Sequence, residues 1–277
     1  MKILSLFDGM SCGQIALNRI GVKVELYLAS EIDKHAIRVT QSNYPNTVQL
    51  GNVQNIGSSS IAVDLLLAGS PCQDFSIAGK PDRKGLGGKR SGLFWEFVRI
   101  LKELRPKYFL LENVKMFQEW QNIITEALGV EPININSNLV SAQNRDRLYW
   151  TNIPNITPPN DRDIMLKDII DVTIPLDRPR YTGNYKSGFP IPISSKKFQC
   201  LRANAGCKTQ GIGICAELGN WRKLTPNECE KLQTVPIDYT LPVISSGIKS
   251  SRQRYKMLGN GWTIDIIAHI LKNIPEI

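Results

Sequence analysis

Reactive side chains occur in three short segments that follow or enter apolar runs of the chain. Cys72 lies in the sequence Gly-Ser-Pro-Cys-Gln-Asp-Phe-Ser, and a thiol in a loop after a strand is a candidate nucleophile. Glu112 ends an apolar run, where a carboxylate is costly unless it is used or paired. Arg145 and Arg147 alternate into an aromatic run, so they point the same way and suit phosphate or carbonyl groups. The structural alternatives are a small buried cysteine, a capping glutamate and a surface ion-pair ladder.

Two further segments point to a nucleoside ligand. The sequence Leu-Phe-Asp-Gly-Met-Ser-Cys-Gly, from Leu6 to Gly13, stands between an expected strand and an expected helix. Its glycines permit a tight turn and the close approach of a ligand to the helix N-terminus. Glu31 follows the next strand, where an acidic residue can accept hydrogen bonds from ribose hydroxyls. The glycine pattern is not GxGxxG, which disfavours a nicotinamide cofactor and leaves a plain βα turn as the alternative.

The composition limits the classes of protein to consider. A chain of 277 residues with 42% hydrophobic residues can form one large domain, or a large and a small one, and is not wholly disordered. The net charge of +9 favours an anionic partner, nucleic acid above all. No apolar run approaches the ~20 residues of a membrane span, and Asp8 ends the first run too early for a signal peptide. The cysteines show no zinc pattern, so we expect no metal and a reducing, cytoplasmic setting.

Strand and helix signals alternate along the first half of the chain. Repeated βα units with near-continuous apolar strands predict an α/β protein with a mainly parallel, doubly wound sheet. After Thr225, which suits a helix N-cap, the helical pattern returns. The expected strands are 2–7, 23–30, 62–68, 108–112 and 147–151, and the expected helices are 14–20, 34–43, 92–104, 116–128 and 263–274.

The segment 152–221 has a different character from the rest of the chain. Prolines and glycines recur in it, and short strand-like pieces alternate with turns, which predicts a small, irregular, mostly β domain. The flanking parts, 1–151 plus 222–277, are expected to form one α/β domain.

Taken in order, these motifs resemble the cytosine-5 DNA methyltransferase family. The resemblance covers residues 3 to about 272. It implies an S-adenosylmethionine-dependent methyltransferase domain with a Rossmann-like sheet, and a target-recognition domain at 152–221. The form of the first motif and the short length are similar to phage or bacterial members and to the eukaryotic de novo enzymes. The commoner first motif is FxGxGG, from which this chain departs by an extra residue and Cys12. The series of motifs is FDGMSCG, GSPCQDFS, ENV, QNRDR, RKLTPNECEKLQTVP and GNGW.

The resemblance implies methyl transfer to carbon 5 of cytosine. Attack of the Cys72 thiolate on carbon 6 would make carbon 5 nucleophilic. Glu112 would hold the ring nitrogen and the amino group, and thereby stabilise the charge that develops. Arg147 would contact the base carbonyl, and Arg145 would support the loop. The sequence does not identify the base that removes the carbon-5 proton.

The resemblance also implies a set of residues that bind S-adenosylmethionine and release S-adenosylhomocysteine. Glu31 would bind the ribose, and Ile32 would pack on the adenine. Asn52 stands where family members usually have Asp, and its amide oxygen can still accept from the adenine amino group. The expected cofactor residues are Phe7, Asp8, Gly9, Met10, Glu31, Ile32, Asn52, Val53, Pro71, Leu93, Asn260 and Trp262.

A cytosine inside a duplex is unreachable, so the implied partner is double-stranded DNA with its target base flipped out. The segment 79–92 carries five basic residues against one acidic residue and several glycines, so we expect it to bind phosphates and close over the target. The expected DNA contacts are Gln73, Ser76, Lys80, Arg83, Lys84, Lys89, Arg90, Lys196, Lys197 and Arg202.

Other functions stay open on the sequence alone. One eukaryotic branch of the family methylates cytosine in a transfer RNA, but its extra Cys-Phe-Thr segment is absent here. A non-catalytic relative is disfavoured because Cys72, Glu112 and Arg147 are all present. We expect a monomer in a bacterial or phage-infected cell, associated with the nucleoid. A cognate restriction endonuclease or a role in phage self-protection would fit, and the target sequence is not determined.

Overall fold

The computed structural model describes residues 1–57, 62–71, 91–178, 190–203, 213–216, 219–246 and 251–275. Its central feature is a seven-stranded sheet in the order β3-β2-β1-β4-β5-β7-β6. The strands β3, β2, β1, β4 and β5 pair in parallel, and β7 pairs antiparallel with β5. This confirms the predicted α/β, mainly parallel sheet. The strands are β1 Lys2–Leu6, β2 Leu26–Ser30, β3 Val48–Gln49, β4 Leu65–Gly69, β5 Tyr108–Val114, β6 Ile133–Asn136 and β7 Asp146–Thr151.

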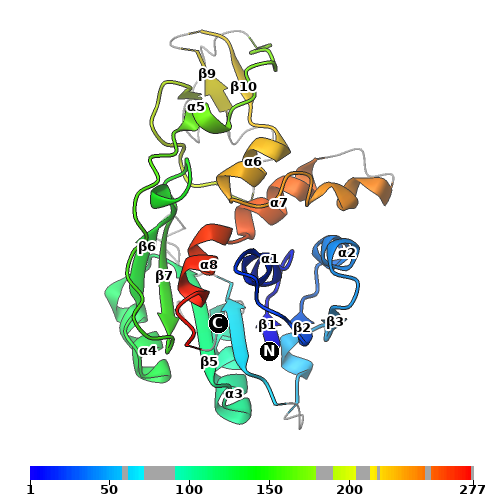
Figure 1. Cartoon of the computed structure of the whole chain (residues 1–277), viewed down its shortest axis with the longest axis vertical. Coiled ribbons are helices and arrows are strands. Elements are labelled where there is room, and N and C mark those ends of the chain that lie inside the picture. The colour runs from blue at the N-terminus through cyan, green and yellow to red at the C-terminus, as the bar shows by residue number, and fades with distance from the viewer. Residues whose placement is uncertain are drawn as a thin grey trace. The chain divides into compact units, whose positions relative to one another are not determined.

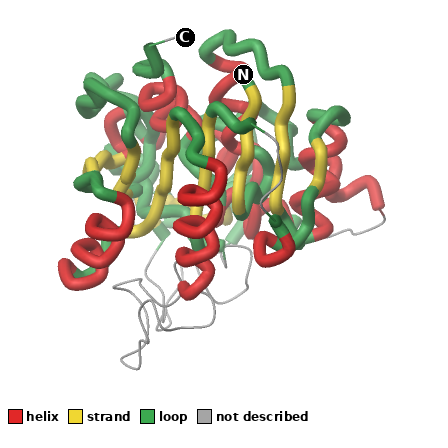
Figure 2. The backbone as a smooth tube through the Cα atoms, turned by 90° about the horizontal axis from the view of Figure 1, so that it is seen from below, coloured by secondary structure: helices red, strands yellow, loops and turns green. Residues whose placement is uncertain are grey.

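Helices connect these strands and lie on both sides of the sheet, as the tube view in Figure 2 shows. The apolar runs and helical spacing located most of them within a few residues, and α2 has the predicted bounds. The helix α7, the short strands β3 and β6, and the one-turn α5 were not predicted. Figure 1 labels the helices, which are α1 Cys12–Arg19, α2 Lys34–Asn43, α3 Phe94–Leu104, α4 Gln118–Leu128, α5 Leu166–Ile169, α6 Pro226–Leu232, α7 Arg252–Asn260 and α8 Ile264–Leu271.

The main hydrophobic core forms on one face of the sheet. Alternate residues of the central strands, among them Leu6, Leu66 and Leu111, pack in one cluster with Phe97 of α3 and Ile124 of α4. Because successive strand residues point to opposite faces, this alternation assigns the remaining residues to the other face. The buried cluster keeps the strand ends fixed in position.

Helix α1 packs closely against the opposite face. A Cβ built on Gly13 would lie 2.6 Å from Cδ1 of Leu67 and 2.7 Å from the hydroxyl oxygen of Tyr27. Only a glycine permits the helix to approach β2 and β4 this closely. The first turn of α1 is therefore held directly above the strand ends.

The chain divides into two compact units. Unit 1 comprises residues 1–135, 146–158 and 267–277, and unit 2 comprises residues 136–145 and 159–266. Unit 2 holds a small sheet of β8 Ile191–Pro192, β9 Gly213–Cys215 and β10 Trp221–Lys223. The predicted division instead assigned residues 136–145 and 222–266 to the larger domain and residues 152–158 to the smaller one.

Buried polar side chains explain why residues 136–145 belong to unit 2. Gln143 donates to the carbonyl of Leu232 at 2.7 Å and to Oε1 of Gln233 at 2.8 Å. Gln233 in turn donates to the carbonyl of Leu258 at 2.6 Å. Because Gln143 and Gln233 are fully buried, these bonds hold residues 136–145 against α6 and α7.

Helix α6 begins as its sequence predicts. The Thr225 hydroxyl accepts from the amide of Glu228, and the Glu228 carboxylate accepts from the amide of Thr225. These two bonds form a capping box, with Pro226 in the first turn.

Among the described residues, each helix is too short or too polar to span a membrane.

Candidate functional site

The turn between β1 and α1 adopts an unusual backbone conformation. Phe7, Gly9 and Ser11 all have left-handed backbones, with φ angles of 55°, 59° and 60°. Two of these three residues carry side chains, for which this conformation is unfavourable. A Cβ on Gly9 would meet nothing within 4 Å, so this part of the turn borders open space. The turn thus offers exposed backbone directly after a strand of the parallel sheet, where ligands bind in this class of fold.

Glu31 follows β2 and fixes this turn from the side. Its Oε2 accepts from the amide of Gly9 at 2.8 Å, and its Oε1 accepts from the amides of Ile32 at 2.7 Å and Asp33 at 2.8 Å. The neighbouring Ile32 side chain is 75% exposed, which is unusual for a large apolar residue. A carboxylate and an exposed aliphatic surface therefore lie next to each other at this strand end.

A third segment at the same edge of the sheet follows β3. Gly51 has a φ of 72°, and its carbonyl accepts from the Ser30 hydroxyl at 2.8 Å. Asn52 caps the short 3-10 helix Val53–Asn55, because its Oδ1 accepts from the amide of Gln54 at 3.1 Å. Val53 is buried in the core. Its side chain thus fixes the segment, and Asn52 presents an amide group at the edge of the sheet.

Asp8 and Met10 point into the protein. The Met10 side chain is buried, so only its backbone borders the turn. The Asp8 carboxylate accepts from the Ser11 hydroxyl and, at 2.9 Å, from the Tyr27 hydroxyl. Burial raises the pKa of Asp8 to about 6, and neighbouring hydroxyl groups offset part of this effect. The predicted cofactor role of these two residues therefore falls to their backbone atoms.

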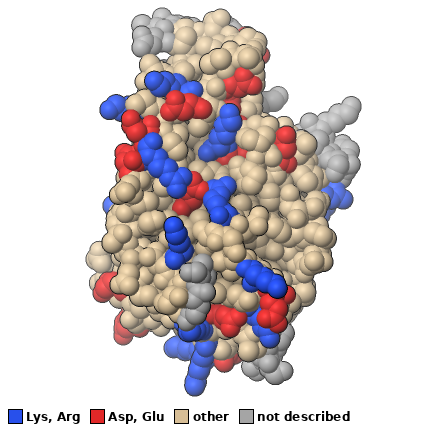
Figure 3. All heavy atoms as spheres, viewed as in Figure 1, with Lys and Arg blue, Asp and Glu red and all other residues tan. Residues whose placement is uncertain are grey.

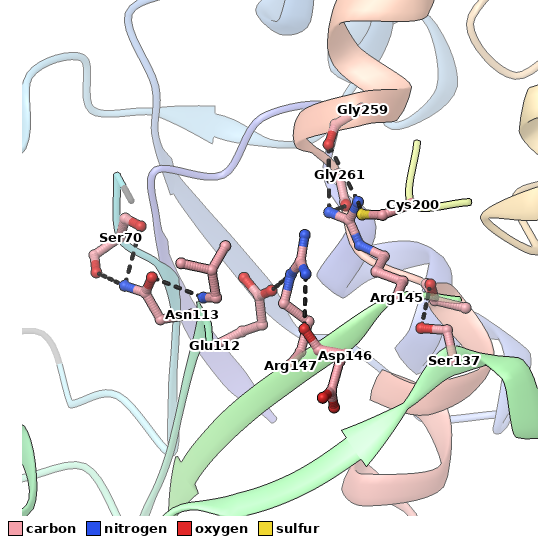
Figure 4. A network of polar contacts seen from close by, with 12 residues as sticks. Ser70, Glu112, Asn113, Ser137, Arg145, Asp146, Arg147, Cys200, Gly259 and Gly261 are labelled. Atoms are coloured by element: carbon pink, nitrogen blue, oxygen red, sulfur yellow. Dashed lines mark hydrogen bonds and ion pairs between the residues drawn. The ribbon is translucent and has the colours of Figure 1, made fainter. Parts of the chain in front are cut away.

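Glu112 and Arg147 form an ion pair at the end of two adjacent strands, which Figure 4 shows. Nε of Arg147 lies 2.9 Å from Oε1 of Glu112, and both side chains are almost buried. In the sheet, Glu112 is paired with Gly69 of β4, from which the chain continues to Ser70 and Pro71. Two groups that the sequence singled out separately are thus brought together at one end of the sheet.

Asn113 connects this pair to the end of β4. Its Nδ2 donates to the Ser70 hydroxyl at 2.9 Å, and its Oδ1 accepts from the amide of Val114 at 2.8 Å. Asn113 is buried, so these bonds hold the chain at Ser70 in place.

Leu93, another expected cofactor residue, is half-buried against the main core.

In unit 2, Arg145 has a supporting position. Its guanidinium group donates to the carbonyl oxygen of Leu201 at 3.0 Å. Figure 4 shows its further bonds, to the carbonyl oxygens of Gly259 at 3.3 Å and Gly261 at 2.7 Å. A Cβ on Gly259 would lie 2.2 Å from the carbonyl carbon of Arg202, so the two backbone segments touch. Arg145 thereby stabilises the turn that presents Asn260, which is exposed, and Trp262, which is buried.

The expected DNA contacts fall into three groups. Lys196 and Arg202 are exposed, as a phosphate contact requires. Lys197 is not free for this role, because its ammonium group donates to the carbonyls of Asn138 at 2.6 Å, Ser141 at 3.2 Å and Ile164 at 2.8 Å. The structure makes Lys197 a structural cation, contrary to the expectation. Cys72, Gln73, Ser76, Lys80, Arg83, Lys84, Lys89 and Arg90 lie outside the described residues.

Basic and acidic side chains are mixed on the face drawn in Figure 3. The ion pairs agree with this picture, because Lys115 and Arg162 lie close to Asp146 and Asp265. Such mixing weakens the attraction of this face for a polyanion.

A pocket of about 350 Å³ in unit 1, bordered by Gln14, Tyr27 and Thr47, contains none of the predicted site residues.

Sequence reasoning missed several residues that shape the site. Tyr27 and Asn113 lie inside apolar strands, where a buried hydroxyl or amide requires a partner. That requirement is the signal that could have identified them. Ser11 lies in the segment where this chain departs from the commoner family motif, and its left-handed backbone was not predicted.

A sequence profile described as C-5 cytosine-specific DNA methylase matches residues 1–181 and 182–276. The type II methyltransferase M.Bsp6I of a Bacillus strain is 29% identical over 99% of this chain and 98% of its own length. The orphan methyltransferase M.SPRI of Bacillus phage SPR is 36% identical, over 61% of this chain and 42% of its own length.

Solved structures agree on the fold. The Entamoeba histolytica methyltransferase EhMeth has a TM-score of 0.82 at 18% identity, over 100% of this chain and 98% of that one. A mutant of Spodoptera frugiperda DNMT2 has a TM-score of 0.78 at 22% identity, over 99% of each chain. At these identities the likeness concerns the fold alone, and the profile match confirms the resemblance drawn from the motifs.

Proposed function

Because the chain belongs to the C-5 cytosine-specific DNA methylase family, we propose that it transfers a methyl group from S-adenosylmethionine to carbon 5 of cytosine in DNA. The observation that carries the proposal is the ion pair of Glu112 and Arg147 at 2.9 Å. It lies at the end of β5, next to the end of β4, from which the chain leads to the Ser-Pro-Cys segment. A carboxylate and a guanidinium held together can recognise the donor and acceptor groups of a cytosine edge.

The residues at the ends of β1, β2 and β3 suit the adenosyl part of S-adenosylmethionine. Glu31 offers a carboxylate to ribose hydroxyls, Ile32 offers an exposed aliphatic face to adenine, and Asn52 offers an amide to its amino group. The open space beside Gly9 leaves room for the ligand to approach the backbone. When bound, the cofactor supplies an activated methyl group. For Asn260 and Trp262 in unit 2, contact with the cofactor stays a prediction.

In the proposed reaction, Glu112 and Arg147 bind and polarise the base. The Glu112 carboxyl group binds the ring nitrogen and the amino group of cytosine, and Arg147 donates to the base carbonyl. Their mutual contact fixes both groups before the base arrives, so little reorganisation is needed. Arg145 acts through the backbone of the 259–261 turn and is a positioning residue in this scheme.

Cys72 is the proposed nucleophile, on the strength of its motif. Its thiolate forms a bond to carbon 6, and the electron pair of the double bond moves to carbon 5, which takes the methyl group and leaves S-adenosylhomocysteine. A base then removes the carbon-5 proton, the electrons restore the double bond, and the bond between sulfur and carbon 6 breaks. This sequence balances without an oxidant or a reductant.

The target base must leave the duplex to reach these groups. The basic segment 79–92 supplies the proposed contacts to the DNA backbone near the target, and Lys196 and Arg202 supply others. The type II name of M.Bsp6I supports a restriction-modification role with a cognate endonuclease, and the orphan phage enzyme M.SPRI supports the alternative of phage self-protection. A monomer in the cytoplasm stays a prediction.

Methyl transfer from tritiated S-adenosylmethionine to unmethylated phage DNA tests the proposal, with RNA as a parallel substrate and bisulfite sequencing of the product. We expect incorporation into one short DNA motif, none with Cys72→Ser, and a loss of about 100-fold or more with Glu112→Gln. Glu103→Gln on the surface of α3 serves as the matched control and should keep full activity. Incorporation into RNA alone, or full activity of Cys72→Ser, would contradict the proposal.

A further inference from the structure

The turn between β1 and α1 needs a source of stability outside its own backbone. Phe7 and Ser11 are held at positive φ angles that side-chain-bearing residues rarely adopt. Such conformations persist where the surroundings hold them in place. Asp8 lies between these two residues, and its backbone amide donates to the carbonyl of Ser30 at 3.1 Å. The immediate neighbours of Asp8 are therefore in a position to stabilise the turn.

The Asp8 carboxylate connects the turn to the interior of unit 1. The hydroxyl of Ser11 donates to Oδ2, and the hydroxyl of Tyr27 donates to Oδ1 at 2.9 Å. Asp8 is 8% exposed and Tyr27 is 3% exposed, so neither hydrogen bond is shared with bulk solvent. Burial, together with the Asp8 charge, raises the pKa of Tyr27, which keeps its hydroxyl protonated as a donor.

A second set of contacts holds these partners in place. Nε2 of Gln14 donates to the Ser11 hydroxyl at 3.1 Å and to the Thr47 hydroxyl at 2.8 Å. Gly13 lies against the Tyr27 hydroxyl, where a larger residue would displace it. The carboxylate is thus reached from α1 and β2, and Gln14 connects this cluster to the segment before β3. We call Asp8, Ser11, Gln14 and Tyr27 the turn clamp.

We propose that Tyr27 and Ser11 are positioning residues for cofactor binding, which hold the Phe7–Ser11 turn in its left-handed form through the Asp8 carboxylate. The inference rests on the proposed function, because it takes the adenosyl group as the ligand of this turn. Neither hydroxyl touches the ligand. Their effect is to keep Gly9 and Glu31 joined, as the 2.8 Å hydrogen bond between them shows. A turn that is ordered beforehand binds its ligand at a lower entropic cost.

The charge state of Asp8 links the turn clamp to pH. As an anion the carboxylate accepts from both hydroxyls, whereas a protonated carboxyl group must itself donate and gives up part of this arrangement. The pKa of Asp8 is about 6 because of burial. The titratable groups that face it among the described residues are Tyr27 from β2 and Glu31 at the end of β2, and Cys12 from α1 acts on Tyr27. Cofactor affinity should therefore fall as the pH decreases through about 6.

Isothermal titration of the full chain with S-adenosylmethionine and S-adenosylhomocysteine tests the inference at pH 7.5. Tyr27→Phe should raise the dissociation constant about tenfold, because one bond to an ionised acceptor is lost. Tyr255→Phe is the matched control, since it loses a 2.8 Å hydrogen bond to the Leu224 carbonyl in unit 2. It should lower the melting temperature similarly and leave the dissociation constant within about twofold.

A pH series with Asp8→Asn separates positioning from general stability. The wild-type dissociation constant should rise several-fold between pH 7 and pH 5, and that of Asp8→Asn should be nearly constant. If Tyr27→Phe binds both ligands like the wild type and merely melts earlier, the positioning role is refuted and the proposed function stands. If the wild type binds neither ligand at any pH, the cofactor assignment fails, and the inference fails with it.

Discussion

Two buried carboxylates of unit 2 and the Asp8 carboxylate of unit 1 have different kinds of partner. In unit 2, Glu228 lies 2.7 Å from Arg222, and Glu230 lies 2.9 Å from Arg254, with all four side chains almost completely buried. In unit 1, Asp8 meets the hydroxyls of Ser11 and Tyr27, and no cation pairs with it among the described residues. The first arrangement neutralises the charge, and the second leaves it in place.

The pKa values follow this difference. Burial alone would raise the pKa of Glu228, but hydrogen bonds from Arg222 and from the backbone amides of Thr225 and Asp171 outweigh it, so the pKa is lowered. Burial of Asp8 is not offset in this way, and its pKa is raised to about 6. Glu228, which is held by Arg222 and by backbone amides, is therefore a structural element. The Asp8 carboxylate, bound to hydroxyls, remains able to change charge near neutral pH, directly beside a ligand-binding turn.

The largest effect is expected from breaking a pair in unit 2. Arg254→Met leaves Glu230 buried without its cation and should lower the free energy of unfolding by about 3–5 kcal/mol. Urea unfolding followed by circular dichroism measures this change. The backbone amides of Asp238 and Thr240 would still donate to the Glu230 carboxylate. A loss below about 1 kcal/mol would mean that these bonds suffice and that the pairs in unit 2 are not essential.

The next effect is a pH dependence that originates in unit 1. Because the pKa of Asp8 rises from 3.8 to about 6 on folding, the folded state binds the proton more tightly. The destabilisation is complete above pH 6 and disappears as the pH falls towards 4. Relative to Asp8→Asn, the wild type should gain up to about 3 kcal/mol over this range. Unfolding measured at several pH values checks the slope.

Glu228→Gln provides the contrasting case from unit 2. The lowered pKa of Glu228 means that the stability it contributes is present above pH 4.5 and is lost as the pH falls below that value. The advantage of the wild type over Glu228→Gln should thus shrink in acid, opposite to Asp8→Asn. The same sign of slope for both variants would contradict the comparison.

A smaller effect tests how closely α1 packs on the turn clamp. In Gly13→Ala the new methyl group would lie 2.7 Å from the Tyr27 hydroxyl and 2.6 Å from Leu67, so the neighbours must shift. We expect a loss of about 1–3 kcal/mol in the free energy of unfolding. Gly57→Ala is the control, because its Cβ would meet no atom within 4 Å. Equal stability of the two variants would show that α1 can move away without cost.

The smallest change in the free energy of unfolding is expected for a partly exposed set of ion pairs on α3. Arg99 on α3 lies 2.8 Å from Glu96 and 3.0 Å from Glu103, and all three side chains are partly exposed. Arg99→Met should cost at most about 0.5–1 kcal/mol, and added salt should reduce this cost. A loss as large as that of Arg254→Met would show that burial is not what separates the two kinds of pair.

Much of the fold could be predicted from the sequence. The strands of unit 1 are near-continuous apolar runs, and helix α2 was located to the residue, because its spacing and its Asp33 cap are local signals. Strand β3 and helix α7 were missed. The first is two residues long, and the second begins without a side-chain cap and is largely polar.

The candidate site was predicted in its parts and not in its arrangement. The residues alone singled out Glu112 and Arg147 separately, and the resemblance implied that both contact the base. The antiparallel pairing of β5 with β7 brings them to 2.9 Å. Lys197 was expected to contact DNA phosphates as a basic residue of the expected target-recognition segment. It lies instead where three carbonyl oxygens converge, an arrangement that depends on segments far apart in the chain.

Residue types and short spacings suffice to predict the family, the alternation of strands and helices, and the kinds of chemistry available, because these are local properties of the chain. Which side chains meet, and what their surroundings do to them, depends on how distant segments pack together. Asp8 belongs to a recognisable motif, but its pKa is raised by burial, and its carboxylate is held inward by Tyr27 from another strand. Desolvation and hydrogen bonding act through space, so no local pattern of residues contains them.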